Sequence, residues 1–250
     1  MKRAERGNDY MKILDDLLTT LKSGEVVQDI RQGPFQTAVL THNCGLASTL
    51  RDYSHHQDDA PVKEAGTLVG KEALVIAQMA YSPSLLEATI GMATVNSLLE
   101  VDEMSCVSLN ARDLLAEKGK GRKVALVGHF PFVAGLRRVV DKLWVLEQHP
   151  HQGDADASEA ESLVPQADVV GITGTAFINH TIERLLGLCR PDAYVIILGG
   201  TAPLSPVLFN YGVDAISGTK VVNPEAVLRY VSQGATFRQL KGIKLLTMER

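Results

Sequence analysis

Cysteine is scarce in this chain, and no two cysteines form a motif. Cys44, Cys106 and Cys189 are the three cysteines, and they lie far apart without a C-x-x-C pair. An odd number of isolated cysteines argues against a disulfide framework or a zinc ribbon and is typical of a reducing compartment. Residues 1–10 lack the apolar segment of a secretory signal, and no apolar run approaches the ~20 residues that cross a bilayer. We therefore expect a cytoplasmic protein without a membrane partner.

The chain also lacks a strong excess of one charge. Its 25 lysine and arginine residues and 29 aspartate and glutamate residues are interspersed, and the net charge is −4. Because no basic stripe or basic–aromatic surface is apparent, we expect no nucleic-acid partner. The nucleophile motif G-x-S-x-G, the phosphate-binding P-loop and the zinc motif H-E-x-x-H are absent as well. Covalent hydrolase chemistry therefore has no support in the sequence.

What the chain does have is enough hydrophobic sequence for a sizeable core, arranged in two successive patterns. Hydrophobic residues make up 45% of the 250 residues, which suits one large domain or two small ones. In the first pattern, periodicity predicts a strand hairpin followed by helices. The predicted elements are a helix over 11–22, strands over 25–31 and 37–42, a helix over 71–80, and a helix that begins at Ser82-Pro83 and ends near Glu100.

Small residues mark the last of these helices. Ala88, Gly91 and Ala93 lie within it, and Ala47 precedes it in the chain. Small side chains in a helix indicate that another element or a ligand approaches its backbone closely. The first part of the chain is therefore predicted to be a small α+β domain over residues 1–108.

After a glycine-rich basic hinge at 119–123, strands and helices alternate strictly. This alternation predicts a parallel sheet covered by helices, in a Rossmann-like α/β domain over residues 109–250. A capping box is expected over 158–161, and Asn223 is expected to cap a helix that begins with Pro224. The predicted strands lie near 123–128, 143–147, 168–173, 194–199 and 213–217, and the predicted helices near 131–142, 159–163, 179–189, 204–211 and 224–233.

The carboxyl ends of the predicted parallel strands are the expected ligand site, because ligands bind beyond these ends in open α/β sheets. Gly128-His129 follows the first strand, Thr173-Gly174-Thr175 the third, and residues 199–203 the fourth. The loop after Gly128 lacks the second glycine of a dinucleotide-binding turn, and Phe130 stands where that motif is small. The sequence therefore predicts a ligand crevice and argues against NAD as its cofactor.

Two residues near this crevice are candidate metal ligands. Glu147 ends the second strand, 19 positions after Gly128, so it could hold a ribose, a metal ion or a ring nitrogen, or be a solvated acid. His129 precedes a predicted helix N-terminus, which favours the neutral imidazole. We expect His129 to act as a metal ligand, a base or a hydrogen-bond donor; the alternative is that it only caps the turn.

Other polar residues have a structural interpretation. Asn179 is predicted to cap a helix, although a cap at the crevice can also face a ligand. His42 and Cys44 could share one strand face, but two ligands do not make a metal site. We interpret the histidines and aspartates at 55–59, and His149, His151, Asp154 and Asp156, as solvated loops, and Thr219 as a turn residue.

Three strings taken together resemble a known family. They are residues 127–132, residues 168–175 with Asn179, and residues 199–206. In this combination they are similar to the family described as "putative heavy-metal chelation", over nearly the whole chain. Residues 91–96 resemble its small first domain, which is similar in fold to the N-terminal domain of enolases. The resemblance implies a site between two domains, and a role in heavy-metal chelation or in making or breaking a pterin-, flavin- or siderophore-like chelator.

The resemblance also implies which positions bind the ligand. They are His129 and Phe130 in the first loop, Thr173, Thr175 and Asn179 in the third, Thr201 and Pro203 in the fourth, and Asn43 and Asn96 in the small domain. A divalent or heavy metal is the implied cofactor. Because the sequence has no cluster of soft ligands, we expect the partner to be a small molecule or a metal chelate rather than a tightly held bare ion.

Two other functions remain open at this point, and the sequence does not decide whether the protein is an enzyme. The Rossmann pattern and Glu147 suit a transferase that uses S-adenosylmethionine or a nucleotide, although the missing glycines argue against it. A non-enzymatic protein that binds a partner in the crevice is the other alternative. A homodimer is a further expectation that the sequence leaves open.

Overall fold

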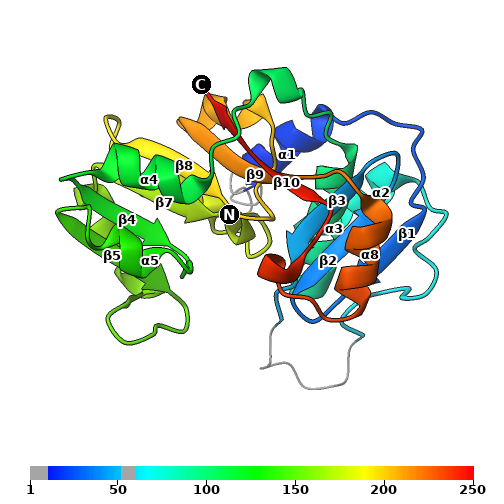
Figure 1. The fold of residues 1–250 in the computed structure, drawn as a ribbon. Coiled ribbons are helices and arrows are strands. Elements are labelled where there is room, and N and C mark those ends of the chain that lie inside the picture. The colour runs from blue at the N-terminus through cyan, green and yellow to red at the C-terminus, as the bar shows by residue number, and fades with distance from the viewer. Residues whose placement is uncertain (1–10, 52–59) are drawn as a thin grey trace, which may run out of the picture.

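The computed structural model describes residues 11–51 and 60–250, and these residues form two β-sheets (Figure 1). The larger sheet has seven strands in the order β10-β9-β8-β7-β4-β5-β6, all parallel except β10, which is antiparallel to β9. The α/β fold class predicted from the sequence is confirmed. The strands are β4 (Lys123–Val127), β5 (Lys142–Glu147), β6 (Ala155–Asp156), β7 (Val169–Thr173), β8 (Tyr194–Leu198), β9 (Ala215–Val221) and β10 (Ile243–Glu249).

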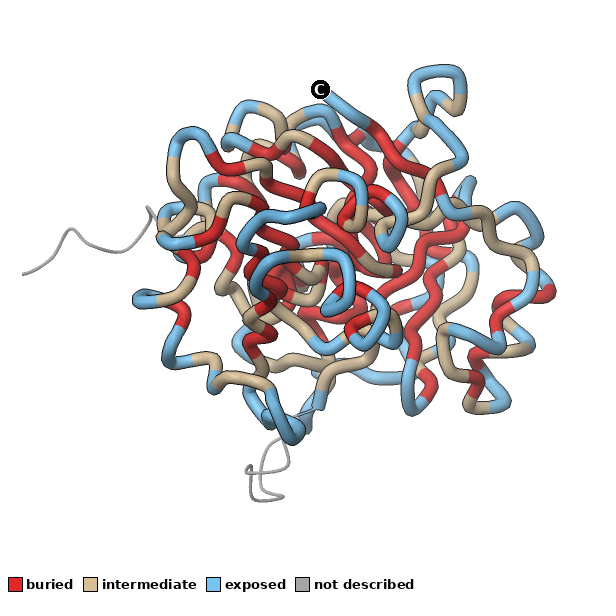
Figure 2. The backbone as a smooth tube through the Cα atoms, turned by 60° about the vertical axis from the view of Figure 1, so that its left-hand side comes forward, coloured by how far each residue is buried: buried red, intermediate tan, exposed pale blue. Residues whose placement is uncertain are grey.

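Helices cover both faces of the larger sheet because its strands are apolar on both sides. Along β4, Val124 and Leu126 pack with α4 (Ala111–Gly119) and α5 (Val133–Leu136), whereas Ala125 belongs to the core on the other face. That second core includes α6 (Ala160–Leu163), α7 (Ile182–Leu188) and α1 (Lys12–Thr19). Figure 2 shows the buried segments in the interior and the exposed ones in the surrounding loops.

The smaller sheet is an antiparallel meander of β1 (Asp29–Gln32), β2 (Gln36–Leu40) and β3 (Cys44–Ser48). One face packs on α3 (Leu85–Leu98), which is preceded in the chain by α2 (Ala73–Ala77). The other face is covered by α8 (Pro224–Ser232), which comes from the end of the chain (Figure 1). Because β3 lies beside β9, the two sheets meet at the carboxyl edge of the larger one.

Several first-half predictions are confirmed and two need correction. The helix α1, the β1–β2 hairpin and the α2 region lie where the periodicity placed them, but β3 was not predicted. The helix α3 begins at Leu85 with Ser84 as its cap, not at Ser82-Pro83. Ser82 instead donates its hydroxyl hydrogen to the Glu87 carboxylate at 2.5 Å, so Pro83 lies in the turn before the helix.

In the second half the parallel strands are confirmed, and the errors concern helix ends and two missed strands. The helix predicted over 131–142 is the single turn α5, because the amides of Asp141 and Lys142 bond to the Arg122 carbonyl and lead into β5. The helix α7 begins at Ile182, not at 179, and residues 204–211 contain a 3-10 helix. Asp156 and Glu159 form the capping box that was expected at 158–161, whereas Asn223 caps α8 as predicted. The strands β6 and β10 were not predicted.

Short 3-10 helices make up most of the remaining regular structure. None of the helices within residues 11–51 and 60–250 is both long enough and apolar enough to cross a membrane. The 3-10 helices are Gln78–Tyr81, Glu103–Ser105, Ala157–Glu159, Val164–Gln166, Gly174–Phe177, Pro206–Tyr211 and Phe237–Gln239.

Candidate functional site

A cavity of about 910 Å³ lies at the carboxyl ends of β4, β7 and β8 and against the middle of β9. This is the edge at which the parallel-sheet pattern predicts ligand binding. The small sheet reaches the cavity through Ser48 at the end of β3, and α4 reaches it through its first turn. Elements from both halves of the chain therefore line one cavity.

Aromatic rings form much of the cavity wall. Phe130 and Phe132 are stacked, with ring centroids 5.3 Å apart and an angle of 18° between the rings. The Phe130 ring lies over the turn at Gly128, whose φ is +105°, so that a Cβ there would stand 3.1 Å from the ring. Across the cavity Phe237 lies on Gly200, where a Cβ would stand 2.7 Å from the ring. The positive φ of Gly128 favours glycine there, and both turns lie under a ring that lines the cavity.

Hydroxyl groups from the strand ends supply the polar part of the wall. The Thr173 and Thr175 hydroxyls are hydrogen-bonded to each other at 3.0 Å. The Thr201 hydroxyl accepts a hydrogen bond from the backbone amide of Ser48 at 2.9 Å and so joins the two sheets. The Thr219 hydroxyl is buried and has no hydrogen-bond partner among the described residues. An unpaired buried hydroxyl costs about 1–3 kcal/mol, which a ligand that bonds to it would recover.

The charged side chains of the cavity give it a positive balance. Arg112 on α4 and Arg238 beside Phe237 line the cavity together with a single acid, Asp113. The Asp113 carboxylate accepts from the Asn110 side-chain amide at 2.7 Å and from Arg112 Nε at 3.1 Å, so Arg112 and Asp113 offset each other and Arg238 supplies the remaining positive charge. The lining therefore favours a neutral or anionic ligand.

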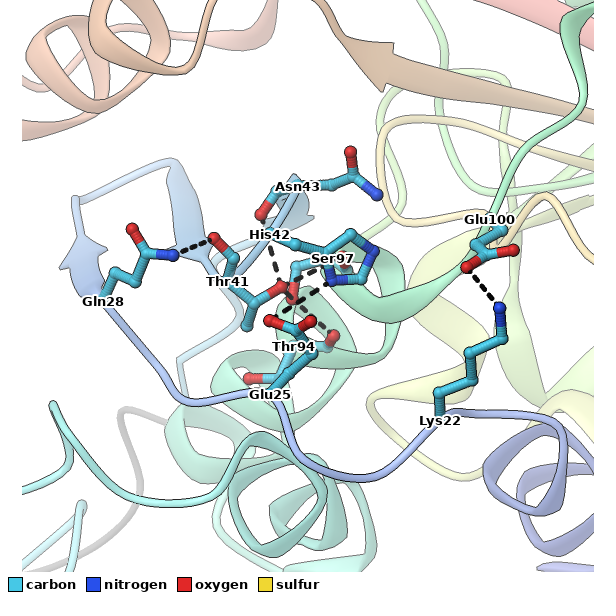
Figure 3. Close-up of polar contacts among 9 residues, drawn as sticks. All are labelled: Lys22, Glu25, Gln28, Thr41, His42, Asn43, Thr94, Ser97 and Glu100. Atoms are coloured by element: carbon cyan, nitrogen blue, oxygen red, sulfur yellow. Dashed lines mark hydrogen bonds and ion pairs between the residues drawn. The ribbon is translucent and has the colours of Figure 1, made fainter.

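A second cavity of about 430 Å³ contains the two predicted asparagines and shares Thr219 with the first. The Asn96 amide nitrogen donates to the carbonyls of Leu46 at 2.8 Å and Thr201 at 3.1 Å, while its Oδ1 is buried without a partner among the described residues. In Figure 3 the Asn43 side chain extends away from the hydrogen bonds between Thr41 and Ser97. These asparagines therefore lie at the junction of the sheets, outside the larger cavity.

His42 and Cys44 do not form a metal site. His42 is exposed and its Nδ1 lies 3.7 Å from Glu25 Oε2 (Figure 3), whereas Cys44 is buried on β3. Burial raises the pKa of the Cys44 thiol to about 12, so the thiolate that a metal needs is disfavoured. The positions of His42 and Cys44 therefore agree with the interpretation that they are structural residues rather than metal ligands.

The candidate metal ligands His129 and Glu147 lie beside the larger cavity rather than in its wall. The Glu147 carboxylate accepts the backbone amides of His129 and, at 3.2 Å, Gln148. The His129 ring bonds through Nδ1 to Asp154 Oδ2 at 2.7 Å. Asp154 was expected in a solvated loop, but its side chain is only 1% exposed and lies against His129 and Arg137, which follow β4 in the chain.

The remaining predicted residues are spread around the site. Phe130, Thr173, Thr175 and Thr201 line the larger cavity, with Gly128 beneath Phe130. Asn179 and Pro203 do not line either cavity; the Asn179 Oδ1 accepts from the Thr181 hydroxyl at 2.7 Å instead of capping α7, and Pro203 is buried. In the described part of the chain, no group of three or more histidine, cysteine, aspartate or glutamate residues is placed to hold a metal ion.

Several lining residues were not predicted from the sequence. Phe237 and Arg238 come from the 3-10 helix after α8, and Asn110 and Arg112 come from the start of α4. The pattern of Thr236 and Gln239, which form a capping box, could have marked the first of these turns. Its position over the strand ends depends on tertiary packing and has no local sequence pattern.

Comparison with known proteins gives consistent matches over most of the chain. Residues 110–248 match the DUF364 family and residues 14–99 match the DUF4213 family, and both carry the description "Putative heavy-metal chelation". An uncharacterized protein of Methanocaldococcus jannaschii is 26% identical over 214 residues, which cover 82% of this chain and 81% of that protein.

Two crystal structures of DUF364 proteins with unknown function have the same fold. The protein from Desulfitobacterium hafniense superposes with a TM-score of 0.85 and 25% identity, covering 98% of this chain and 100% of that chain. The protein from Pyrococcus horikoshii gives a TM-score of 0.81 and 19% identity, covering 96% and 99%. These similarities extend across both sheets.

Proposed function

Because the chain belongs to the family described as "putative heavy-metal chelation", we propose that its larger cavity binds a compact, planar metal chelator, free or loaded with metal. The observation that carries the proposal is the lining of this cavity, in which aromatic rings face hydroxyl groups from several strand ends. The family description alone names no ligand, so the ligand class rests on the chemistry of this wall.

A planar ring fits the aromatic part of the wall. Phe130 and Phe132 form one stacked pair, and Phe237 lies over the neighbouring turn at Gly200. Offset stacking on such rings is worth about 0.5–1.5 kcal/mol beyond the burial of apolar area. The hydroxyls of Thr175 and Thr219 then offer hydrogen bonds to substituents at the edge of the ring.

The same geometry argues against a dinucleotide. In a dinucleotide fold, the glycine turn after the first strand leaves its backbone amides open to the pyrophosphate. Here the Phe130 ring covers the turn at Gly128 and also approaches Gly199, where a Cβ would stand 3.9 Å from it. The wall therefore supports a compact ligand over NAD or a similarly extended nucleotide.

The donor atoms for a metal are proposed to come largely from the chelator. No cage of three or more protein ligands is present within the described residues, so the described side chains alone do not account for tight chelation. Arg112 is paired with Asp113, and Arg238 is the further charged side chain of the lining, which favours the negative charge of a catecholate or carboxylate chelator. We infer a protein that recognises the chelate as a molecule.

Calorimetry with a defined panel tests this proposal. The probes are 2,3-dihydroxybenzoate, 6-carboxypterin and riboflavin, each with and without Zn²⁺ or Fe³⁺, and the comparison ligands are NAD and S-adenosylmethionine. We expect at least one chelator to bind with one equivalent per chain and both nucleotide cofactors to be silent. Binding of NAD or S-adenosylmethionine alone would refute the proposal, as would silence of the whole panel.

A matched pair of variants tests whether the ligand binds in the larger cavity. Phe237→Ala removes a ring from the cavity wall and should weaken binding at least tenfold. Phe35→Ala removes a ring that is 51% exposed and lies in neither cavity, so binding should not change. Equal effects of the two substitutions would move the ligand out of the larger cavity.

A further inference from the structure

The second cavity, of about 430 Å³, is lined by an amide whose orientation is fixed by the fold. The Asn96 nitrogen donates to the carbonyl of Leu46 at 2.8 Å and to that of Thr201 at 3.1 Å. Because carbonyls only accept hydrogen bonds, the amide cannot flip, and its Oδ1 is held as an acceptor. This oxygen is buried and has no partner among the described residues. A ligand that satisfies it must therefore bring a hydrogen-bond donor.

Further oxygen atoms that accept hydrogen bonds line the same cavity. Thr219 contributes a second buried oxygen without a partner, so that two of the three such side-chain atoms in the described part of the chain belong to residues of this cavity. Glu100 and Asp102 add two carboxylates. A primary ammonium group matches this set of acceptors, because it carries a positive charge and three N–H donors and has no acceptor of its own.

The charges around this cavity leave a negative balance. Lys220 is the basic side chain of the lining, and its Nζ is engaged by Glu103 Oε1 at 2.9 Å. Glu100 is paired with Lys22 at 2.7 Å (Figure 3), but both side chains are largely exposed, so this ion pair is weak. The Asp102 carboxylate has no ion pair among the described residues and accepts only a backbone amide. A cationic group is therefore favoured beside Asp102.

Apolar side chains supply the rest of the wall. Leu99, Val101 and Val221 line the cavity beside the polar groups, and such side chains pack against the methylene groups of an alkyl chain. We propose that the second cavity binds a small aliphatic amine, whose ammonium group is held by Asn96 and Asp102. This proposal does not depend on the chelator, because it concerns another ligand in a cavity that shares only Thr219 with the larger one.

Calorimetry with the full-length chain tests the proposal. The probe is 1,4-diaminobutane, its uncharged counterpart is 1,4-butanediol, and Ca²⁺ is the comparison cation. The titrations are made in about 0.15 M NaCl, which screens attraction between exposed charges that are far apart. We expect one diamine per chain, at least tenfold weaker binding of the diol, and no displacement of the diamine by Ca²⁺. In NMR spectra of the ¹⁵N-labelled chain, the side-chain amide signal of Asn96 should shift as the diamine binds.

A matched pair of substitutions tests the role of Asp102. Asp102→Asn removes the charge and keeps a residue that can accept the Met104 amide, which Asp102 binds at 2.9 Å as the cap of a 3-10 helix. This variant should bind the diamine at least tenfold more weakly. Asp141→Asn removes the same charge from a residue that lines neither cavity, so the affinity should not change. Both aspartates are exposed, so both variants should fold.

Five outcomes would overturn the proposal: no binding of the diamine, equal affinity for the diol, displacement of the diamine by Ca²⁺, an Asn96 signal that does not move, or equal affinities of Asp102→Asn and Asp141→Asn. The result is separate from that of the chelator panel. If a chelator binds and the diamine is silent, only the amine site fails. If the diamine binds as expected while every chelator is silent, only the proposal for the larger cavity fails.

Discussion

Replacement of Gly91 by alanine should destabilise the protein strongly, because the backbone of another segment occupies the place of the new methyl group. Gly91 lies in the middle of α3 and faces the 3-10 helix that follows α2. A Cβ at this position would lie 2.5 Å from the carbonyl carbon of Met79 and 2.6 Å from the Cα of Ala80. Ordinary carbon contacts need about 3.5 Å or more, so the backbones would have to separate by about 1 Å.

The magnitude follows from two opposing terms. Alanine is favoured over glycine in a helix interior by about 0.8–1.0 kcal/mol. Overpacking of a closed core costs about 1–3 kcal/mol and occasionally more. The clash involves backbone atoms, which cannot rotate away as a side chain can, and Ile90 and Met92 beside Gly91 are at most 2% exposed. We therefore expect a net loss of about 2 kcal/mol or more in the free energy of unfolding.

The matched control is Gly187→Ala in α7. Gly187 is also helical, but it is exposed, and a Cβ there would meet no atom within 4 Å. This variant should be unchanged or gain up to about 1 kcal/mol from helix propensity. Urea titration followed by circular dichroism measures both changes. A Gly91→Ala protein as stable as the wild type would refute the packing argument, and so would equal losses in both variants.

Three further predictions concern single polar groups. Thr219→Val removes a buried hydroxyl that has no hydrogen-bond partner among the described residues. Thermal melting should therefore show no loss of stability, while calorimetry should show weaker binding of the cavity ligand. A clear loss of stability would contradict this reasoning. Lys244 and Lys220 lower the pKa of Glu103 from 4.5 to about 2, and this stabilisation is present above pH 4.5 and is lost as the pH falls towards 2. Glu103→Gln should therefore be less stable than the wild type at pH 7, and urea titrations should converge as the pH falls through this window; equal stability at pH 7 would contradict the effect. Burial raises the pKa of Cys44 to about 12, so mass spectrometry should detect its alkylation by iodoacetamide at pH 8 only after unfolding, whereas labelling of the native protein would contradict its burial.

The parallel strands were predictable because burial on both faces makes them continuous apolar runs. Lys123–Val127 and Tyr194–Leu198 are such runs, each followed by glycine. By contrast β3, with the sequence CGLAS, has little of the composition typical of strands. Its glycine is needed by the packing, because a Cβ at Gly45 would lie 2.8 Å from the carbonyl carbon of Asn96. Tertiary contacts therefore determine this strand, and its local pattern does not reveal it.

The location of the site was more predictable than its contents. Strand ends can be read from the pattern, and Thr173, Thr175 and Thr201 at those ends line the larger cavity. Phe237 was missed because its turn reaches the cavity only after α8 has packed on the small sheet. Asp154 was misread because an acidic loop is usually solvated, whereas this carboxylate is buried beside His129 and Arg137. Both errors concern contacts between segments that are distant in the chain, and local periodicity does not reveal such contacts.

Two glycines, one within α3 and one on the strand β3 that packs against it, connect the stability of the fold to the geometry of the site. Gly45 and Gly91 let α3 approach β3 on one side and the segment after α2 on the other. At this distance the Asn96 amide reaches the carbonyls of both Leu46 and Thr201, which joins the small sheet to the turn after β8. Because both acceptors are carbonyls, the amide must present its nitrogen to them, and its oxygen, beside the second cavity, has no partner among the described residues. Any Gly91→Ala protein that still folds should therefore bind the cavity ligand more weakly than Gly187→Ala, since a displaced α3 would carry Asn96 away from Thr201.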